Sequence, residues 1–384
     1  MIVGVPTETF PGEHRVALVP DTVHTLVDKG LEVAIETGAG AAAGFADDLY
    51  VSRGAQVVPA ADLFERSQVV LQVRTFGANP HGAPALEYLR ADHIVIGFAD
   101  ALDRSDRISA LARRGVTLLS MELMPRISRA QSMDALSSMA TIAGYKSVLM
   151  AAGLLPRMFP LLMTAAGTLT PAKVLVLGAG VAGLQAIATA KRLGASVSAY
   201  DARAAVKDQI NSLGADFVDL GIDTGDSEDE GGYATAHDDT FYERQRSALA
   251  TVIADADVVV STAAIPGQPA PLLITRHAVE SMKAGSVIID LAAERGGNCE
   301  ITEPGSDVEL EGVTVCGPLN LPATIPAHAS QMYAHNIATF LLHLVDDDGQ
   351  LQLNVEDEIT AGTLVARAGT IVHERVLQVQ GPAN

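Results

Sequence analysis

Short apolar runs alternate with longer segments whose apolar residues recur at helical spacing through the first third of the chain. The apolar runs predict strands at residues 2–6, 33–36, 56–58, 69–73, 93–96 and 116–120. The segments between them predict helices that begin near Asp21, Asp47, Asp62 and Asp106, because an acidic side chain caps the free N–H groups at a helix start. Strands that alternate with helices predict a parallel sheet covered by helices on both faces.

The same alternation returns after a long helical segment at residues 132–153. It predicts strands at residues 173–177, 195–200, 216–220, 258–261, 287–291 and 313–317, and helices after residue 183, at 203–213 and at 240–254. A last helix, residues 327–344, is predicted to return to the first domain. We therefore expect an α/β protein with two doubly wound parallel-sheet, Rossmann-like domains flanking a cleft. The first domain is discontinuous, residues 1–135 plus 328–384, and the second spans residues 136–327.

One turn in the second domain carries a specific chemical signal. Gly178, Gly180 and Gly183 form a G-x-G-x-x-G motif directly after an apolar strand and before a helical run. Gly178 allows the tight turn, Gly180 lets the backbone approach a pyrophosphate, and Gly183 lets the helix lie close to the strand. The helix N-terminus then presents free N–H groups and a partial positive charge to the phosphates. This arrangement predicts dinucleotide binding.

An acidic residue at the end of the next predicted strand bears on which dinucleotide is bound. Asp201 can accept hydrogen bonds from the adenosine ribose hydroxyls and repel a 2′-phosphate, which favours NAD(H) over NADP(H). Arg203 argues the other way, because a guanidinium suits a phosphate. Loops 262–267 and 294–298 follow two further strands, and ligands of open α/β sheets bind at such carboxyl ends.

Residues 223–239 are acidic, contain glycine and lack any periodicity, so they predict a surface loop. One interpretation is a solvated linker without function. Tyr233, next to two glycines, favours the other interpretation, a loop that folds over a bound ligand.

The composition limits the partners of the chain. A formal net charge of −20 disfavours binding to nucleic acid or to an anionic membrane through this chain alone. The longest apolar stretch, residues 147–167, is interrupted by two prolines and an arginine, and the first residues lack a basic region, so we expect a soluble protein without a signal peptide. Cys299 and Cys316 fit a reducing compartment, and the absence of a Cys or His cluster in the sequence predicts no metal.

Residues 121–138 place two arginines, a glutamine, an aspartate and several serines between an apolar strand and an apolar helix, beside the expected cleft. Because buried polar groups must be paired, one interpretation is a network of Arg126 with Asp134 at the domain junction. The other is that these groups hold a nicotinamide carboxamide and its ribose and present one ring face at the mouth of the cleft.

Several stretches resemble a single family, at residues 11–16, 125–134, 163–168, 178–194, 288–291 and 296–299. That family is the NAD(H)-binding component, domain I of the α subunit, of the proton-translocating nicotinamide nucleotide transhydrogenase, which is related to alanine dehydrogenase. The similarity covers nearly the whole chain and is most specific at 125–134. It implies that the chain binds NAD(H) and exchanges a hydride with NADP(H) held by a separate domain III. It also implies a membrane-spanning subunit that couples the reaction to proton movement, a homodimer, and a location at the cytoplasmic face of the membrane.

The resemblance also assigns individual residues. The nicotinamide-site positions of the family, which we take as catalytic, fall on Arg126, Gln131, Asp134 and Ser137, its mobile-loop tyrosine on Tyr233 and its ribose acid on Asp201. With the turn and the loops, the predicted cofactor-binding residues are Gly178, Gly180, Val181, Ala182, Gly183, Asp201, Ala202, Arg203, Tyr233, Ala264 and Asn298.

Alanine dehydrogenase is the main alternative. Oxidising an amino acid requires an acid/base group and a cationic clamp for the substrate carboxylate, whereas ring-to-ring hydride transfer requires only alignment. Residues 96–102, where that family places a histidine, contain none, its catalytic aspartate position matches Glu294, and its substrate lysine falls near Arg74. Arg15 is either a remnant of such a site or an anchor of the first loop. A nucleotide-sensing protein without catalysis is the third interpretation.

Overall fold

The computed structural model describes residues 1–103, 105–222, 239–264, 269–346 and 348–380. The chain divides into two compact units. Unit 1 comprises Met1–Met139 and Pro322–Asn384, and unit 2 comprises Ala140–Leu321. Each unit is built on its own sheet, and both predicted sheets are confirmed.

The sheet of unit 1 consists of β1 (Ile2–Val5), β2 (Glu32–Glu36), β3 (Gln56–Val58), β4 (Val69–Arg74), β5 (Ile94–Phe98), β6 (Thr117–Ser120), β16 (Leu364–Arg367) and β17 (Thr370–Ile371). The strand order is β17-β16-β6-β5-β4-β1-β2-β3. The first six strands pair in parallel, and the two C-terminal strands add an antiparallel edge. The chain thus starts in the middle of the sheet, builds outward to β3 and then crosses to β4, which is the doubly wound order.

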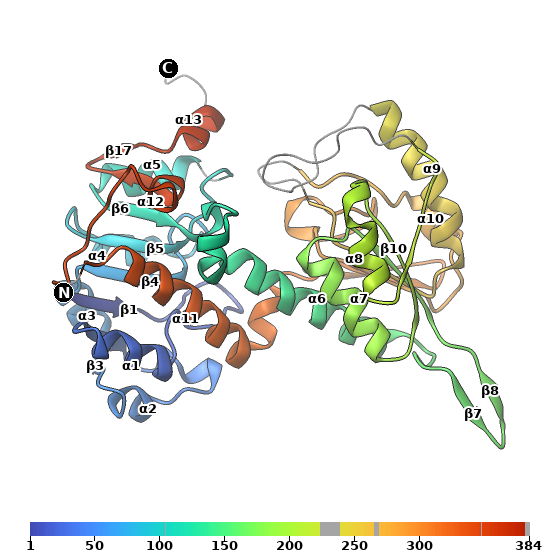
Figure 1. Ribbon diagram of the computed structural model, residues 1–384, viewed down its shortest axis with the longest axis horizontal. Helices are drawn as coiled ribbons and strands as arrows, with labels where there is room; N and C mark the ends of the chain where they lie inside the picture. Colours follow the sequence, from blue (N-terminus) through green and yellow to red (C-terminus); the bar gives the residue numbers. More distant parts are fainter. Residues whose placement is uncertain (104, 223–238, 265–268, 347, 381–384) are drawn as a thin grey trace. The chain divides into compact units, whose positions relative to one another are not determined.

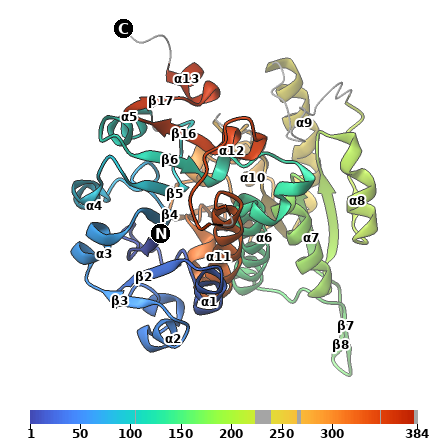
Figure 2. The same cartoon turned by 60° about the vertical axis from the view of Figure 1, so that its left-hand side comes forward.

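Helices cover both faces of this sheet (Figure 2). The helices α3 (Ala60–Arg66), α4 (Ala83–Tyr88) and α5 (Ser105–Arg113) lie on one side, and α1 (Pro20–Asp28) and α11 (Pro326–His343) lie on the other. The unit also contains α2 (Asp47–Val51), α12 (Glu358–Thr363) and α13 (Glu374–Gln380). Fully buried Leu63, Ile108 and Leu111 pack on the sheet from α3 and α5 and form part of its core.

The sheet of unit 2 repeats the order of the first five strands of unit 1. Its strands are β9 (Lys173–Leu177), β10 (Ser196–Tyr200), β11 (Asp216–Phe217), β12 (Val258–Ser261), β13 (Val287–Asp290), β14 (Asp307–Leu310) and β15 (Val313–Cys316). They are arranged β11-β10-β9-β12-β13-β15-β14, and β14 is the antiparallel edge strand. The chain reverses direction across the sheet between β9 and β12, and ligands of such sheets bind at this switch point.

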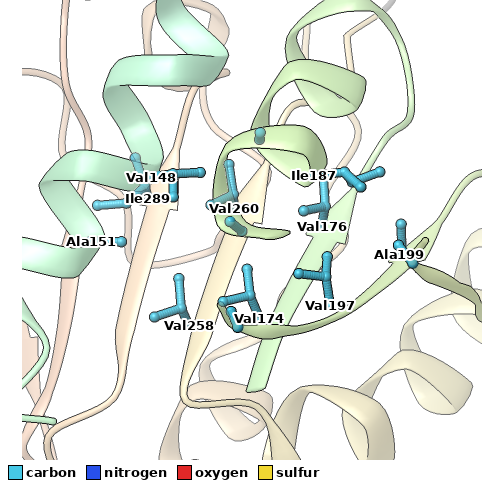
Figure 3. Packing of buried hydrophobic residues seen from close by; sticks show 14 of the residues in the cluster. Val148, Ala151, Val174, Val176, Ile187, Val197, Ala199, Val258, Val260 and Ile289 are labelled. Carbon is cyan, nitrogen blue, oxygen red and sulfur yellow. The ribbon is translucent and has the colours of Figure 1, made fainter. Parts of the chain in front are cut away.

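Alternation along the strands of unit 2 builds two cores. Val174 and Val176 of β9 belong to a cluster with residues of α6 (Ala135–Leu154), α7 (Val181–Arg192) and α8 (Lys207–Ser212). Figure 3 shows the part of this cluster that α6 and α7 contribute. Leu175 and Leu177 point the other way and pack with α9 (Asp239–Asp255) and α10 (Arg276–Glu280). A strand apolar on both faces is the expected signature of a central parallel strand.

One element of unit 2 differs from the predicted pattern. Residues within the apolar stretch 147–167 and just beyond it form a two-stranded antiparallel hairpin, β7 (Leu162–Thr164) and β8 (Gly167–Leu169). It extends from unit 2 as a thin arm (Figure 1). Within the described ranges, no helix is both long and apolar enough to cross a membrane.

Candidate functional site

The glycine motif lies at the carboxyl end of β9, next to the end of β12. Gly178 has a left-handed backbone, with φ of 93°, and its N–H donates to the carbonyl of Tyr200 at 2.8 Å. A Cβ at this position would lie 2.7 Å from Oγ1 of Thr262, which follows β12. Both the backbone angle and the close neighbour require glycine here.

Gly183 and Gly180 are constrained in opposite ways. A Cβ on Gly183 would lie 1.8 Å from the carbonyl oxygen of Gly178, so the first turn of α7 packs directly on the loop. A Cβ on Gly180 would meet no atom of the described residues within 4 Å, and its φ of −71° suits any residue. The fold therefore explains the glycine at 183 but not the glycine at 180.

Helix α7 begins immediately after Gly180, which is its N-cap. The N–H groups of the first turn, from Val181, Ala182 and Gly183, have no intrahelical acceptor, because such bonds begin one turn later. Val181 is exposed and Ala182 is half-buried. These amides, with the positive end of the helix dipole, can bind a phosphate that approaches over the open space at Gly180.

Asp201 follows β10, and its carboxylate is fully engaged by the protein. Its Oδ2 accepts from the N–H of Ala179 at 2.7 Å and from Nη2 of Arg203 at 2.8 Å. Its Oδ1 accepts from the backbone N–H and from Nε of Arg203, both at 2.9 Å. A carboxylate offers about four acceptor positions, and all four are used. A ribose hydroxyl would therefore have to displace one of these donors, and the carboxylate already engages Nε and Nη2 of Arg203.

Asn298 lies behind the loop that follows β12. Its side-chain oxygen accepts from Oγ of Ser261 at 2.7 Å and from the N–H of Ala263 at 3.1 Å. Its side-chain nitrogen donates to the carbonyls of Ala263 at 2.9 Å and Pro271 at 2.8 Å. The side chain is fully buried, and all of its hydrogen-bonding groups are used within the protein. Asn298 thus holds the loop that leads to the exposed Ala264, and a contact between Asn298 and the cofactor stays a prediction.

Asp290 binds the backbone N–H of Asn298. No site prediction included Asp290. It lies at the end of β13, is fully buried, and accepts from the N–H groups of Ala292, Asn298 and Cys299 and from Oγ1 of Thr302. Burial raises the pKa of Asp290, and these hydrogen bonds act against that rise. The sequence signal for this structural role was a single acidic residue at the end of an apolar strand.

Two further residues of unit 2, Ala202 and Tyr233, were predicted to bind the cofactor. Ala202 is half-buried beside Asp201. Tyr233 lies outside the described residues, so its predicted role stays a prediction.

The polar segment of unit 1 follows β6 and forms a short 3-10 helix, Ser128–Met133. Arg126 precedes it, Gln131 lies within it, and both side chains are exposed. Asp134 follows it and accepts from the N–H of Ser137 at 2.9 Å and from its Oγ at 2.5 Å at the start of α6. The structure thus brings Asp134 and Ser137 into contact.

A buried ionic cluster elsewhere in unit 1 contains Arg15. Arg15 donates through Nε and Nη2 to the carboxylate of Glu13, at 2.7 and 2.6 Å, and Arg74 lies 3.4 Å from the same carboxylate. Glu8 accepts from the N–H groups of Val73 and Arg74, and burial followed by the charge of Glu13 raises the pKa of Glu8 to about 8. Arg15 is thus paired within the first loop, and Glu13 links that loop to Arg74 at the end of β4; both interpretations of Arg15 stay predictions.

Comparisons with known proteins agree on a family. Residues 4–143 match the model described as alanine dehydrogenase/PNT, N-terminal domain, and residues 147–374 match its C-terminal domain. The chain is 45% identical to the first part of NAD(P) transhydrogenase subunit alpha of Rhodospirillum rubrum, over 97% of this chain and 98% of that protein.

Two solved structures resemble the chain throughout. The crystal structure of a transhydrogenase from Sinorhizobium meliloti has a TM-score of 0.86 at 44% identity and covers 97% of this chain and all of that one. A structure of L-alanine dehydrogenase has a TM-score of 0.81 at 30% identity, covering 99% of each chain. Within the described residues, no group of three or more metal-binding side chains comes together.

Proposed function

This chain belongs to the alanine dehydrogenase/PNT family, and we propose that it is the NAD(H)-binding subunit of a proton-translocating transhydrogenase. The observation that carries the proposal is the 45% identity to a transhydrogenase subunit over nearly the full length of both chains. Identity to L-alanine dehydrogenase is lower, at 30%. In the proposed reaction a hydride passes between NAD(H) on this chain and NADP(H) on a partner domain III.

The glycine turn of unit 2 fits the pyrophosphate of NAD(H). The open space over Gly180 and the first-turn amides of α7 suit a doubly phosphorylated group. In the proposed complex Asp201 accepts from the adenosine ribose, and a ribose hydroxyl replaces one donor of Arg203. Both features favour NAD(H) over NADP(H), because the carboxylate repels a 2′-phosphate and also occupies the nearby arginine.

The nicotinamide end is assigned to the segment of unit 1. In this proposal Arg126 and Gln131 bind the carboxamide and ribose, and Asp134 and Ser137 order the start of α6 beside them. Bound NADH supplies the hydride itself. The side chains only need to align two rings, since hydride transfer moves no proton through the protein.

The partners follow from the assignment as a subunit. We propose that the chain works with an NADP(H)-binding domain and a membrane-spanning subunit that couples hydride transfer to proton movement. The chain would then be peripheral, at the cytoplasmic face of the membrane.

We further propose that a second copy of this chain covers the hairpin arm, which we define as residues 158–172. These residues include no charged side chain, although 19% of the chain is charged and its net charge is −20. Leu161, Met163 and Leu169 are 55%, 75% and 49% exposed. Two short strands are marginal alone in water. Strongly acidic chains repel each other, and a contact through an uncharged surface lessens this repulsion. A second copy of the chain supplies the same uncharged surface, related to the first by a two-fold axis.

The dimer is tested by placing charge on the arm. Met163→Asp with Leu169→Asp should give a monomer in sedimentation velocity, because two carboxylates per copy would be buried at the interface. Val355→Asp, at a position in unit 1 whose exposure of 57% lies between those of Met163 and Leu169, is the control and should remain dimeric. A dimeric arm variant would remove the arm from the interface, and a monomeric parent would contradict the dimer itself.

The function is tested with the purified chain, an NADP(H)-binding transhydrogenase domain, NADPH and the acetylpyridine analogue of NAD⁺. We expect reduction of the analogue that requires both proteins. NADH oxidation that depends on pyruvate and ammonium would instead establish alanine dehydrogenase activity, the alternative suggested by the similarity to L-alanine dehydrogenase at a TM-score of 0.81. NADH binding with neither reaction would support a non-catalytic nucleotide sensor.

A further inference from the structure

The 3-10 helix Ser128–Met133 presents three different faces. Residues three apart are superposed in a 3-10 helix. Ala130 and Met133 share the face that is buried, and Ser128 and Gln131 share a face that is exposed. Arg129 and Ser132 share the third face, which is also exposed; the side chain of Arg129 and the backbone carbonyl of Ser132 each contact the C-terminal segment of unit 1.

The first of these two contacts is an ion pair to Asp357. Nη1 of Arg129 lies 2.6 Å from Oδ1 of Asp357. The second is a hydrogen bond from Nδ2 of Asn336, in α11, to the carbonyl of Ser132 at 2.8 Å. A 3-10 helix has poor internal hydrogen-bond geometry and is rarely this long. Its orientation therefore depends on such external contacts.

Asp357 is itself held rigidly. Its Oδ2 accepts from Nε2 of His343 at 2.9 Å and, as the N-cap of α12, from the N–H of Thr360 at 2.9 Å. Partial burial opposes ionisation of this carboxyl, but the hydrogen bonds from His343, Thr360 and Arg129 outweigh it and hold the pKa of Asp357 below its usual range. The carboxylate is thus a charged, fixed point to which Arg129 is attached.

We infer that Asp357 is a positioning residue for hydride transfer, which acts through Arg129 to orient the face of the 3-10 helix that carries Gln131. The inference rests on the proposed function, since it assigns that helix to the nicotinamide. Because Asp357 would not touch the cofactor, it should affect ring alignment rather than binding of the adenosine and pyrophosphate end, which is assigned to unit 2. A misalignment of about 1 Å can slow a reaction by about a hundredfold.

The test is a double-mutant cycle on Arg129→Ala and Asp357→Ala. Single-turnover hydride transfer should slow about tenfold in each variant, and the double variant should be no slower than the slower of the two single variants, because both substitutions remove the same contact. The Kd for NADH should change less than threefold. The inference would be overturned if Arg129→Ala transferred hydride at the rate of the parent chain. It would also be overturned if the slowing factors of the two single variants multiplied in the double variant.

A second readout needs no cofactor. Amide hydrogen exchange over residues 128–133 should accelerate at least fivefold in Arg129→Ala and in Asp357→Ala. Asp357→Ala also removes the cap of α12 and lowers stability, so Arg129→Ala is the decisive variant. Unchanged exchange in it would also overturn the inference.

The matched control is Arg157→Ala. Arg157 is exposed to nearly the same extent as Arg129, 54% against 52%, and pairs with Asp257 of unit 2 at 2.7 Å. The Arg157→Ala substitution should leave the rate of hydride transfer and the amide exchange over residues 128–133 unchanged. Slower hydride transfer in Arg157→Ala would show that the effect is not specific to the Arg129–Asp357 pair, and would contradict the inference. If the parent chain transfers no hydride, the proposed function fails. If the parent reacts but the Arg129 variants match it, only this inference fails.

Discussion

Gly180→Ala separates the requirements of the fold from those of the ligand. Gly180 has an ordinary extended backbone, with φ of −71° and ψ of −168°, and a methyl group on its Cα would meet nothing within 4 Å. The described part of the folded chain therefore does not require glycine here. The proposed pyrophosphate does, because it must approach the backbone more closely than a side chain allows.

The expected magnitudes follow from this geometry. Alanine restricts the unfolded chain, which stabilises the protein by about 0.4–1 kcal/mol, and it is a poorer N-cap than glycine by a similar amount. The free energy of unfolding should therefore change by less than about 0.5 kcal/mol. The methyl group would push the pyrophosphate away from the first-turn amides of α7. Losing one charge-assisted hydrogen bond, about 1.5–3 kcal/mol, raises the Kd for NADH about 10- to 100-fold.

The assay pairs an NADH fluorescence titration with urea unfolding. Gly153→Ala is the control, because Gly153 also lies in open space with an ordinary φ but near the end of α6. It should bind NADH like the parent. Unchanged NADH affinity in Gly180→Ala would refute the assignment of the pyrophosphate to this turn, and a large loss of stability would show that the position is structural.

Three further predictions test the same account. Gly183→Ala should lower the free energy of unfolding in urea by at least about 2 kcal/mol, because its Cβ would lie 1.8 Å from the carbonyl of Gly178; a parent-like midpoint would contradict this packing. Asp201→Asn should raise NADPH affinity relative to NADH about tenfold or more in parallel titrations, because it frees Arg203 for a 2′-phosphate. An unchanged ratio would place the ribose elsewhere. Burial and a neighbouring carboxylate raise the pKa of Glu8 from 4.5 to about 8, so the folded chain retains a proton that the unfolded chain releases. Unfolding free energy should then fall between about pH 4.5 and 8, by a few kcal/mol at most, and Glu8→Gln should flatten that slope.

Most of the fold could be predicted because its signals are local. The apolar runs 56–58 and 258–261 coincide with β3 and β12, since each strand lies between clear polar or helical neighbours. The strand predicted at 216–220 is shorter, 216–217, because it is an edge strand that pairs with β10 at only two positions. The hairpin β7–β8 was not predicted, because its turn, Ala165-Ala166, lacks the Asn-Gly or Asp-Gly signal.

The site was predictable where it depends on the backbone and not where it depends on side-chain pairing. The glycine spacing predicted a tight turn that packs on the next helix, as Gly178 and Gly183 do. The sequence could not reveal that Arg203 and the N–H of Ala179 together saturate Asp201, because that depends on rotamers. Nor could it connect Arg129 to Asp357, since the two are brought together only by the return of the C-terminal residues to unit 1.

The central claim is that a hydride passes directly from NADH on this chain to NADP⁺ on a partner. It is tested most directly with NADH that carries deuterium at the transferred position of C4, incubated with the chain, the NADP(H)-binding domain and NADP⁺ in ordinary water. Mass spectrometry of the product should find deuterium in NADPH in proportion to the NADH oxidised. NADPH without deuterium, or NADH oxidation that occurs only when pyruvate and ammonium are added, would contradict the account.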